Sequence, residues 1–188
     1  MNTTVTYCLT RQNAVPQIFL RHVTELTQRN LHLFQENADP SRKYLLIENV
    51  TADGDRVLFS VKQELAEYFG LGEYVVPPVL KDFIGCITDG GFVDPHTDPD
   101  LPGRMHVRIN VLISQPGGCI PLIDDIPITI AVGDAWLNLA SRCVHATTPV
   151  VGPGYRSVIS FGYQISPERG DQLYEVFRSW ISEVRRLQ

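Results

Sequence analysis

One stretch of this chain, from Arg104 to Ser114, alternates between apolar and polar residues more strictly than any other. One face of the stretch is apolar and carries Met105, Val107, Ile109, Val111 and Ile113. The other face carries Arg104, His106, Arg108, Asn110 and Leu112. An alternation of period two predicts a β-strand that buries its apolar face in a core. A face that only meets solvent could equally well carry Lys, Glu, Ser and Thr. The Arg, His, Arg and Asn side chains of the second face therefore indicate a functional site. The solvated face of an edge strand is the alternative interpretation.

A second feature, shortly before this strand, is the His-Thr-Asp sequence from His96 to Asp98. On an extended backbone, residues two positions apart point to the same side, so this imidazole and this carboxylate can reach one ion. His145 supplies a further imidazole. Two His and one carboxylate, with the opposite coordination positions open, suit Fe(II). The competing interpretation is an ordinary polar turn, because Pro and Asp flank the motif.

Arg156 follows His145 by eleven residues, in a run that predicts another β-strand. A guanidinium can hold a carboxylate through two parallel hydrogen bonds, which a lone Lys does less well. Between Gly90 and Gly162 the order of motifs is therefore His-x-Asp, a strand, Gly-Gly, a strand, GDAWLN, His and Arg. This ordered set is hard to assemble by chance, and it favours the metal site over the polar turn.

These motifs resemble those of the Fe(II)/2-oxoglutarate-dependent dioxygenase superfamily. The matching segments are HTD, RMHV, GGC, GDAWLN, VHATTPV and YRSVISF. Within the superfamily, the chain is most similar to the aspartyl/asparaginyl β-hydroxylase type, which includes some proline hydroxylases. The resemblance implies a mainly β fold with flanking helices, built on a double-stranded β-helix (jelly roll, cupin-like) core. It also implies Fe(II) as the cofactor, with 2-oxoglutarate and O2 as co-substrates.

The resemblance also implies roles for individual residues. The metal ligands, which are the catalytic residues of this type, would be His96, Asp98 and His145. Contacts to 2-oxoglutarate would come from Arg156, Arg104 and His106. Some relatives carry Ser two positions after the arginine, whereas this chain has Val158 there, which leaves a second contact to the distal carboxylate unassigned. The candidate substrate-binding residues are Arg108 and Asn110.

The reaction implied by the resemblance is hydroxylation of an unactivated C–H bond with release of succinate and CO2. The expected substrate is a free or carrier-bound amino acid or a small amino-acid-like metabolite. One alternative is a prolyl, aspartyl or asparaginyl side chain of a peptide or protein. Another is a cupin-like metal-binding or sensor domain without catalysis. A zinc hydrolase with the same three ligands lacks an obvious additional Glu base beside them.

The composition argues against several other classes of protein. The 188 residues, 44% of them apolar, suffice for a real core, and we expect a single oxygenase domain over residues 1–188. The net charge is −5 and no basic run exceeds the Arg185–Arg186 pair, which disfavours a nucleic-acid substrate. The four cysteines form no Cys-x-x-Cys pair, and no signal peptide or membrane-spanning run is visible. We therefore expect a cytoplasmic protein with a small-molecule or peptide substrate.

Helices are predicted both before and after the core segment along the chain. Apolar residues at helical spacing predict one helix from Val15 to about Glu36, interrupted near Asn30. A second helix is predicted to begin at Asp53. These helices, within about residues 1–72, would form a scaffold outside the larger sheet of a core that occupies about 74–165.

The C-terminal part, about residues 166–188, predicts one further helix with Ser166 as its N-cap. Its apolar stripe consists of Leu173, Val176, Phe177, Trp180, Ile181, Val184 and Leu187. Such a stripe is typical of core packing, and a homodimer contact through this helix is the alternative.

In the core, Tyr74 to Thr88 predicts two strands interrupted by Pro77–Pro78, and Asp124–Asp125 predicts the turn of a hairpin.

Overall fold

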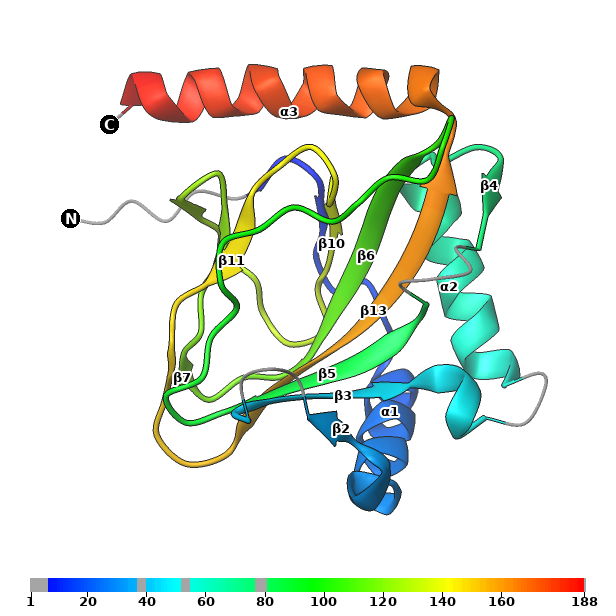
Figure 1. The fold of residues 1–188 in the computed structure, drawn as a ribbon, viewed down its shortest axis with the longest axis vertical. Coiled ribbons are helices and arrows are strands. Elements are labelled where there is room, and N and C mark those ends of the chain that lie inside the picture. The colour runs from blue at the N-terminus through cyan, green and yellow to red at the C-terminus, as the bar shows by residue number, and fades with distance from the viewer. Residues whose placement is uncertain (1–6, 37–39, 52–54, 77–80, 188) are drawn as a thin grey trace.

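The fold is built on one large antiparallel β-sheet (Figure 1). A computed structural model describes residues 7–36, 40–51, 55–76 and 81–187. Within these residues, eight strands form the sheet in the order β1-β10-β6-β13-β5-β3-β2, and β4 pairs with the end of β13. The strands are β1 (Thr10–Arg11), β2 (Gln35–Glu36), β3 (Arg42–Leu46), β4 (Tyr74–Val75), β5 (Phe83–Thr88), β6 (Met105–Ser114), β10 (Ala135–Asn138) and β13 (Tyr155–Ile165).

The strand predicted from the alternation is β6, an inner strand of this sheet between β10 and β13. Its apolar face, which includes Val107 and Ile109, belongs to the main hydrophobic core. Its opposite face is also largely buried, because His106, Arg108 and Leu112 are each no more than 5% exposed. The alternative interpretation, the solvated face of an edge strand, is therefore wrong. The polar residues of β6 lie inside the molecule.

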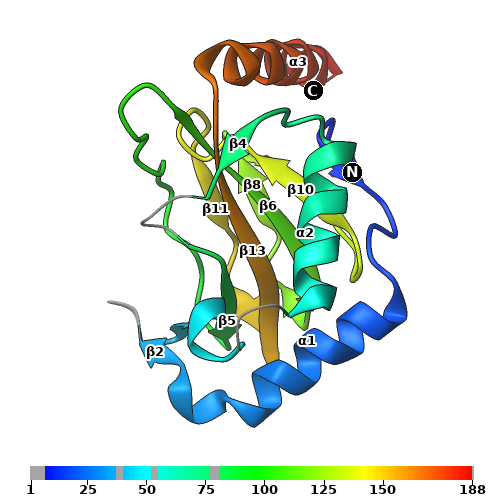
Figure 2. The same cartoon turned by 90° about the vertical axis from the view of Figure 1, so that its right-hand side faces the viewer.

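Two helices, α1 (Gln17–Arg29) and α2 (Arg56–Tyr68), cover one face of the large sheet (Figures 1 and 2). Phe19 and Val23 of α1 and Leu65 of α2 are fully buried in the same apolar cluster as the sheet residues Ile109 and Phe161. These buried residues place α1 and α2 against the large sheet, on its outer face. The opposite face of the sheet is left for the smaller sheets and the site.

Two small sheets lie on that opposite face, on the side of the large sheet away from α2 (Figure 1). The backbone of Asp124 and Asp125 has φ angles of 48° and 65°, which fits the two-residue hairpin turn predicted there. Gly118 has φ +69°, and a Cβ on it would lie 2.5 Å from the carbonyl oxygen of Pro149, so this position of the Gly-Gly motif requires glycine. The strands are β7 (Gly117–Gly118), β8 (Pro121–Ile123), β9 (Ile126–Pro127), β11 (His145–Thr147) and β12 (Val150–Val151).

The C-terminal helix α3 (Pro167–Leu187) crosses one end of the sheets (Figure 1). The predicted N-cap is confirmed, because the backbone N–H of Arg169 donates to Ser166 Oγ over 3.2 Å. The buried residues of the predicted stripe are Leu173, Phe177, Ile181 and Val184. The prediction for Val176 is wrong, because its side chain is 49% exposed at the margin of the stripe.

The interruption predicted near Asn30 is confirmed, but the segment after it is not α-helical. The first helix ends at Arg29, and the residues that follow form the short 3-10 helix η1 (Leu31–Leu33) and then β2. The strand β3 is likewise followed by a second 3-10 helix, η2 (Ile47–Asn49). The predicted start of the second helix at Asp53 and the Pro77–Pro78 interruption lie outside the described residues. No described helix is both long enough and apolar enough to span a membrane.

Candidate metal centre

His96, Asp98 and His145 form a compact cluster on the side of the large sheet away from α1 and α2. Each offers one ligand atom, and the three atoms lie within 4.8 Å of one another. The backbones of His96 and His145 form an antiparallel bridge, with N–H to carbonyl distances of 3.2 and 2.9 Å in the two directions. The N–H of Asp98 donates to the carbonyl of Ala140 over 2.8 Å. The extended segment predicted for this motif is therefore pinned to the chain around His145.

Both imidazoles are oriented by backbone carbonyls. Nδ1 of His96 lies 2.7 Å from the carbonyl oxygen of Asp94, and Nδ1 of His145 lies 3.3 Å from that of Cys143. A carbonyl can only accept, so each Nδ1 donates and each Nε2 keeps a free lone pair. This is the usual arrangement of a metal-binding histidine. Burial, with the nearby His96 ring, lowers the pKa of His145 to about 4, so this side chain is neutral and ready to ligate near neutral pH.

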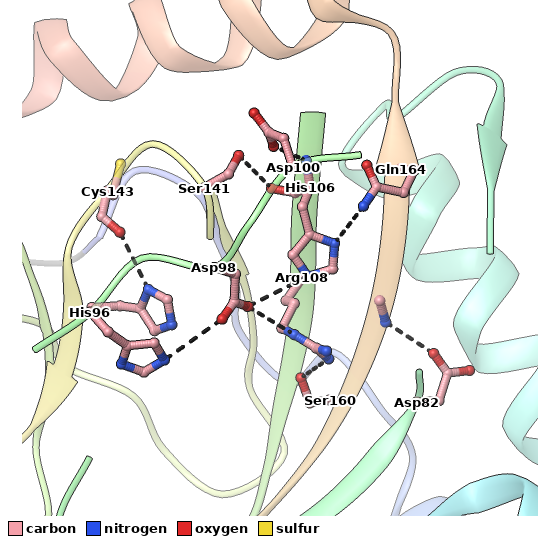
Figure 3. A network of polar contacts seen from close by, with 12 residues as sticks. Asp82, His96, Asp98, Asp100, His106, Arg108, Ser141, Cys143, Ser160 and Gln164 are labelled. Carbon is pink, nitrogen blue, oxygen red and sulfur yellow. Dashed lines mark hydrogen bonds and ion pairs between the residues drawn. The ribbon is translucent and has the colours of Figure 1, made fainter. Parts of the chain in front are cut away.

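Asp98 lies between these imidazoles and two donors on β6 (Figure 3). Its Oδ1 is 3.7 Å from Nε2 of His96, whereas its Oδ2 is 3.3 Å from Nε of Arg108 and 3.5 Å from Nε2 of His106. Burial by itself would raise the pKa of Asp98, but the contact with His106 and the charge of Arg108 outweigh burial and lower it to about 2. The carboxylate is thus ionised and available to a cation.

Arg156 is a buried cation without an anionic partner in the part of the chain that the structure describes. Its side chain is 4% exposed, and Nε has no hydrogen-bond partner. Among the described residues none forms an ion pair with it, and its Cζ lies 5.9 Å from the centroid of the Trp136 ring. Burial lowers the pKa of Arg156. Leaving a guanidinium buried and unpaired is costly, so this position indicates a binding site for an anionic group.

One cavity, of about 660 Å³, contains both the cluster and Arg156. Its floor is formed by residues of five neighbouring strands of the large sheet, among them Trp136, Asn110, Ser160, Phe83 and Tyr44. Its roof comes from the other side, with Val93, His96 and Asp98, the strand β8, and β11, which carries His145. A volume of this size is typical of a site for small molecules.

Comparison with known proteins shows which fold this is. No family model matches the sequence, and no curated protein matches it either. Among solved structures, a prolyl-4-hydroxylase from Pseudomonas putida superposes with a TM-score of 0.61 at 12% identity, over 84% of this chain and 91% of that one. HygX from Streptomyces hygroscopicus, with nickel and 2-oxoglutarate bound, gives a TM-score of 0.62 at 13% identity, over 82% and 81%.

An oxidoreductase of the 2OG-Fe(II) oxygenase family from Burkholderia pseudomallei gives a TM-score of 0.57 at 15% identity, over 81% of this chain and 80% of that one. The chain has the fold of the 2-oxoglutarate/Fe(II) oxygenases. At these identities the likeness concerns the fold alone. The site residues of this oxygenase fold must therefore be judged from their own geometry.

The structure brings most of the predicted site residues together, and it separates one of them. Besides the three candidate ligands, Arg156, Arg108 and Asn110 line the main cavity. Arg104 does not line that cavity. It lines a second hollow of about 400 Å³ near the start of α3, together with Arg169 and Ser166. Its assignment to 2-oxoglutarate therefore has no support in the geometry, because a residue at the end of β6 lies beyond the cavity.

His106 is in a different position from the one expected for a co-substrate contact. Its side chain is fully buried, does not line the cavity, and lies behind Asp98. Sequence analysis also missed Trp136, Ser160 and Gln164, which contact Arg156, Arg108 and His106 in turn. The feature they share is their place in the alternation of side chains along a strand. Each occupies an alternating strand position, and such positions carry information only once the pairing of the strands is known.

Proposed function

We propose that this protein is a non-haem Fe(II)- and 2-oxoglutarate-dependent oxygenase that hydroxylates an unactivated C–H bond. The observation that carries the proposal is the coincidence, in one cavity, of the His96–Asp98–His145 cluster and the unpaired guanidinium of Arg156. Two imidazoles and one carboxylate are the ligand set that suits Fe(II) in oxygenases. A buried guanidinium without an anion suits a dicarboxylic co-substrate. The likeness to solved 2-oxoglutarate oxygenases supports the same chemistry.

The geometry of the three candidate ligands suits a metal ion, and that of Arg156 suits 2-oxoglutarate. Nε2 of His96, Nε2 of His145 and a carboxylate oxygen of Asp98 would hold the metal, because their other polar atoms are occupied by the protein. The bound iron would supply the activation of O2, coupled to oxidation of 2-oxoglutarate to succinate and CO2. Arg156 would pair with the distal carboxylate of 2-oxoglutarate. The apolar side chains of Ile87 and Val158, which line the same cavity, would exclude water.

The substrate is proposed to be an amino acid, free or carrier-bound, or a small amino-acid-like metabolite. A cavity of about 660 Å³ has room for 2-oxoglutarate and a second small molecule. Asn110 offers an amide toward this space, whereas Arg108 is already engaged by Asp98 and Ser160. The alternative is a peptide side chain. One solved neighbour is a prolyl hydroxylase from Trichoplax adhaerens in complex with a peptide fragment, and another is HygX with hygromycin B bound.

The finer resemblance to the aspartyl/asparaginyl β-hydroxylase type rests on the order of the motifs. Some members of that type lack a carboxylate ligand, whereas this chain has Asp98, whose carboxylate lies with both imidazoles. The placement of Arg104 and His106 does not support the co-substrate contacts of that type. The proposal therefore assigns the distal carboxylate of 2-oxoglutarate to Arg156 alone.

The experiment that tests the proposal is conversion of 2-oxoglutarate to succinate by iron-loaded protein across a panel of amino acids and short peptides. We expect one substrate class to stimulate succinate formation and to gain a hydroxyl group, with loss of both in His96→Ala. Stimulation by peptides alone would favour the side-chain hydroxylase. Tight iron binding without succinate from any member of the panel would favour the non-catalytic cupin-like sensor.

A further inference from the structure

The two oxygens of Asp98 have different surroundings. Oδ1 faces the imidazole of His96, with 3.7 Å to Nε2. Oδ2 faces the opposite way, toward Arg108 and His106 on β6 (Figure 3). The side chain of Asp98 is 13% exposed, so the protein, and not water, determines its orientation.

His106 is held in place by contacts on both its side chain and its backbone. Nε2 of Gln164 lies 3.1 Å from Nδ1 of the ring, and both side chains are buried. With the Gln164 amide in this orientation Nδ1 accepts, so the ring hydrogen is on Nε2, which lies 3.5 Å from Oδ2 of Asp98 and has no hydrogen-bond partner among the described residues. The N–H of His106 donates to Oδ1 of Asp100 over 2.7 Å, and its carbonyl accepts from Oγ of Ser141 over 3.2 Å. The segment that carries Asp98 is thereby fastened to β6.

Arg108 is fixed as firmly as His106. Its Nε lies 3.3 Å from Oδ2 of Asp98, and its Nη1 donates to Oγ of Ser160 over 3.0 Å. Its guanidinium also lies over the ring of Phe83, with 4.8 Å from Cζ to the centroid. The side chain is 6% exposed. Two immobilised donors from one strand therefore converge on a single oxygen of the carboxylate.

We propose that His106 and Arg108 are positioning residues for Asp98. They hold Oδ2, so that Oδ1 alone is offered to a divalent metal between the two imidazoles. A carboxylate without such partners can rotate and bind a metal through both oxygens, which would occupy an additional coordination position. Holding one oxygen opposes that rotation and leaves open positions for co-substrate and O2. The inference rests on the proposed function and assigns to His106 a task other than binding 2-oxoglutarate.

The test is titration of the metal-free protein with Co(II), followed by the visible absorption of the bound ion. This probe reports both the dissociation constant and the coordination geometry, without any turnover. The informative variants are His106→Phe, which keeps a ring and removes the N–H donor, and Gln164→Leu, which leaves the ring in place but removes its partner. The matched control is His22→Phe, because His22 pairs with Asp55 over 2.7 Å and lies on α1, on the far side of the large sheet.

We expect His106→Phe to weaken Co(II) binding about tenfold, the lower end of the usual cost of losing a partner of a metal ligand, and to change the absorption spectrum. Gln164→Leu should weaken binding in the same direction, and the double variant should bind no more weakly than His106→Phe, because both act through one contact. His22→Phe should bind Co(II) as the wild type does. Circular dichroism and thermal melting of the metal-free forms would confirm that each variant is folded.

Three results would overturn the inference. The first is an unchanged dissociation constant and spectrum in a folded His106→Phe or Gln164→Leu variant. The second is full additivity of the two losses, which would indicate separate structural effects. The third is a wild type that binds no Co(II), which would remove the metal centre itself. That last result is the only one of the three that also defeats the proposed function, so the two failures can be told apart.

Discussion

The environment of Arg156 is the strongest single indication of a ligand-binding site in this protein. Its side chain lies among strands of the large sheet, is 4% exposed, and has an Nε without a partner. A folded protein rarely keeps an ionised group in such a position unless a ligand completes it. The resemblance implied a role for this residue, because an arginine at a fixed distance after the second candidate histidine ligand is part of it.

We expect Arg156→Ala to weaken 2-oxoglutarate binding by roughly 10- to 100-fold, because one or two charge-assisted hydrogen bonds are worth about 1.5–3 kcal/mol. Arg156→Lys should be intermediate, since it keeps the charge and loses the two-pronged geometry. The measurement is calorimetric titration of 2-oxoglutarate into protein loaded with Ni(II). Co(II) affinity is the control and should not change. Equal 2-oxoglutarate affinity in all three forms would remove Arg156 from the site.

His145 gives a pH dependence that can be measured without metal. Burial and the neighbouring His96 lower its pKa from 6.5 to about 4, so the folded state favours the neutral ring. This contribution to stability is complete above pH 6.5 and is lost as the pH falls toward 4. We expect the metal-free protein to lose on the order of 2–3 kcal/mol through this group between about pH 7 and about pH 4.5. Urea unfolding at both pH values measures the loss, and His145→Gln should show a correspondingly smaller one.

His106 and Arg104 show where residue-level prediction stopped. His106 lies on β6 and Arg104 directly precedes this strand, and the alternation assigns both to one face. Yet His106 is buried behind Asp98, whereas Arg104 lines a separate hollow. Parity predicts the side of a sheet to which a residue points. The alternation does not predict how far along the strand the cavity extends, because the extent of the cavity depends on which loop crosses the strand.

At the scale of elements, the sequence predicted best where one pattern decides the structure. The alternation predicted β6, the helical stripes predicted α1, α2 and α3, and the Asp124–Asp125 pair predicted the β8–β9 hairpin. Short elements were missed, among them η1, η2 and β2. These elements have two or three residues each, and pairing partners elsewhere in the chain, such as Tyr44 for Gln35, determine whether a strand forms.

The contact between α1 and α2 gives a prediction at this scale. Oδ1 of Asp55 accepts from the N–H groups of Val57 and Leu58 at the start of α2, and its Oδ2 contacts His22 of α1 over 2.7 Å. We expect Asp55→Ala to lower the free energy of unfolding by about 1–2 kcal/mol, since it removes the N-cap. Asp55→Asn should lose less, because it keeps an acceptor for the cap. Urea denaturation compares the two, and equal stability of Asp55→Ala and the wild type would contradict the assigned cap.

At the scale of the whole molecule, the candidate site joins the two sides of the fold. The floor of the cavity belongs to the large sheet, whereas the ligands come from the segment after β5 and from β11 opposite it. Arg108 of the large sheet contacts Asp98 of the other side over 3.3 Å. A metal bound by the three ligands would therefore stabilise the packing of the smaller sheets on the larger one.

We expect a divalent metal to stabilise the protein as a single unit. At about 100 times the dissociation constant, binding to the folded state alone contributes about 2.7 kcal/mol. For a chain of this size, that corresponds to a rise in Tm of about 5–10 °C. Differential scanning fluorimetry with Ni(II) or Mn(II) measures the shift. The same concentrations should produce little shift in Asp98→Ala, and an equal shift there would place the metal elsewhere.

Every role assigned to the cavity depends on the binding of one ferrous ion by three side chains. The measurement is anaerobic equilibrium dialysis of Fe(II) against the wild type, His96→Ala and the control His32→Ala, which alters a histidine of η1 outside the cluster. We predict one iron per chain in the wild type and the control, and binding at least about a hundredfold weaker in His96→Ala, because a ligand itself is lost. Equal iron binding by all three proteins, or none by the wild type, would contradict the account.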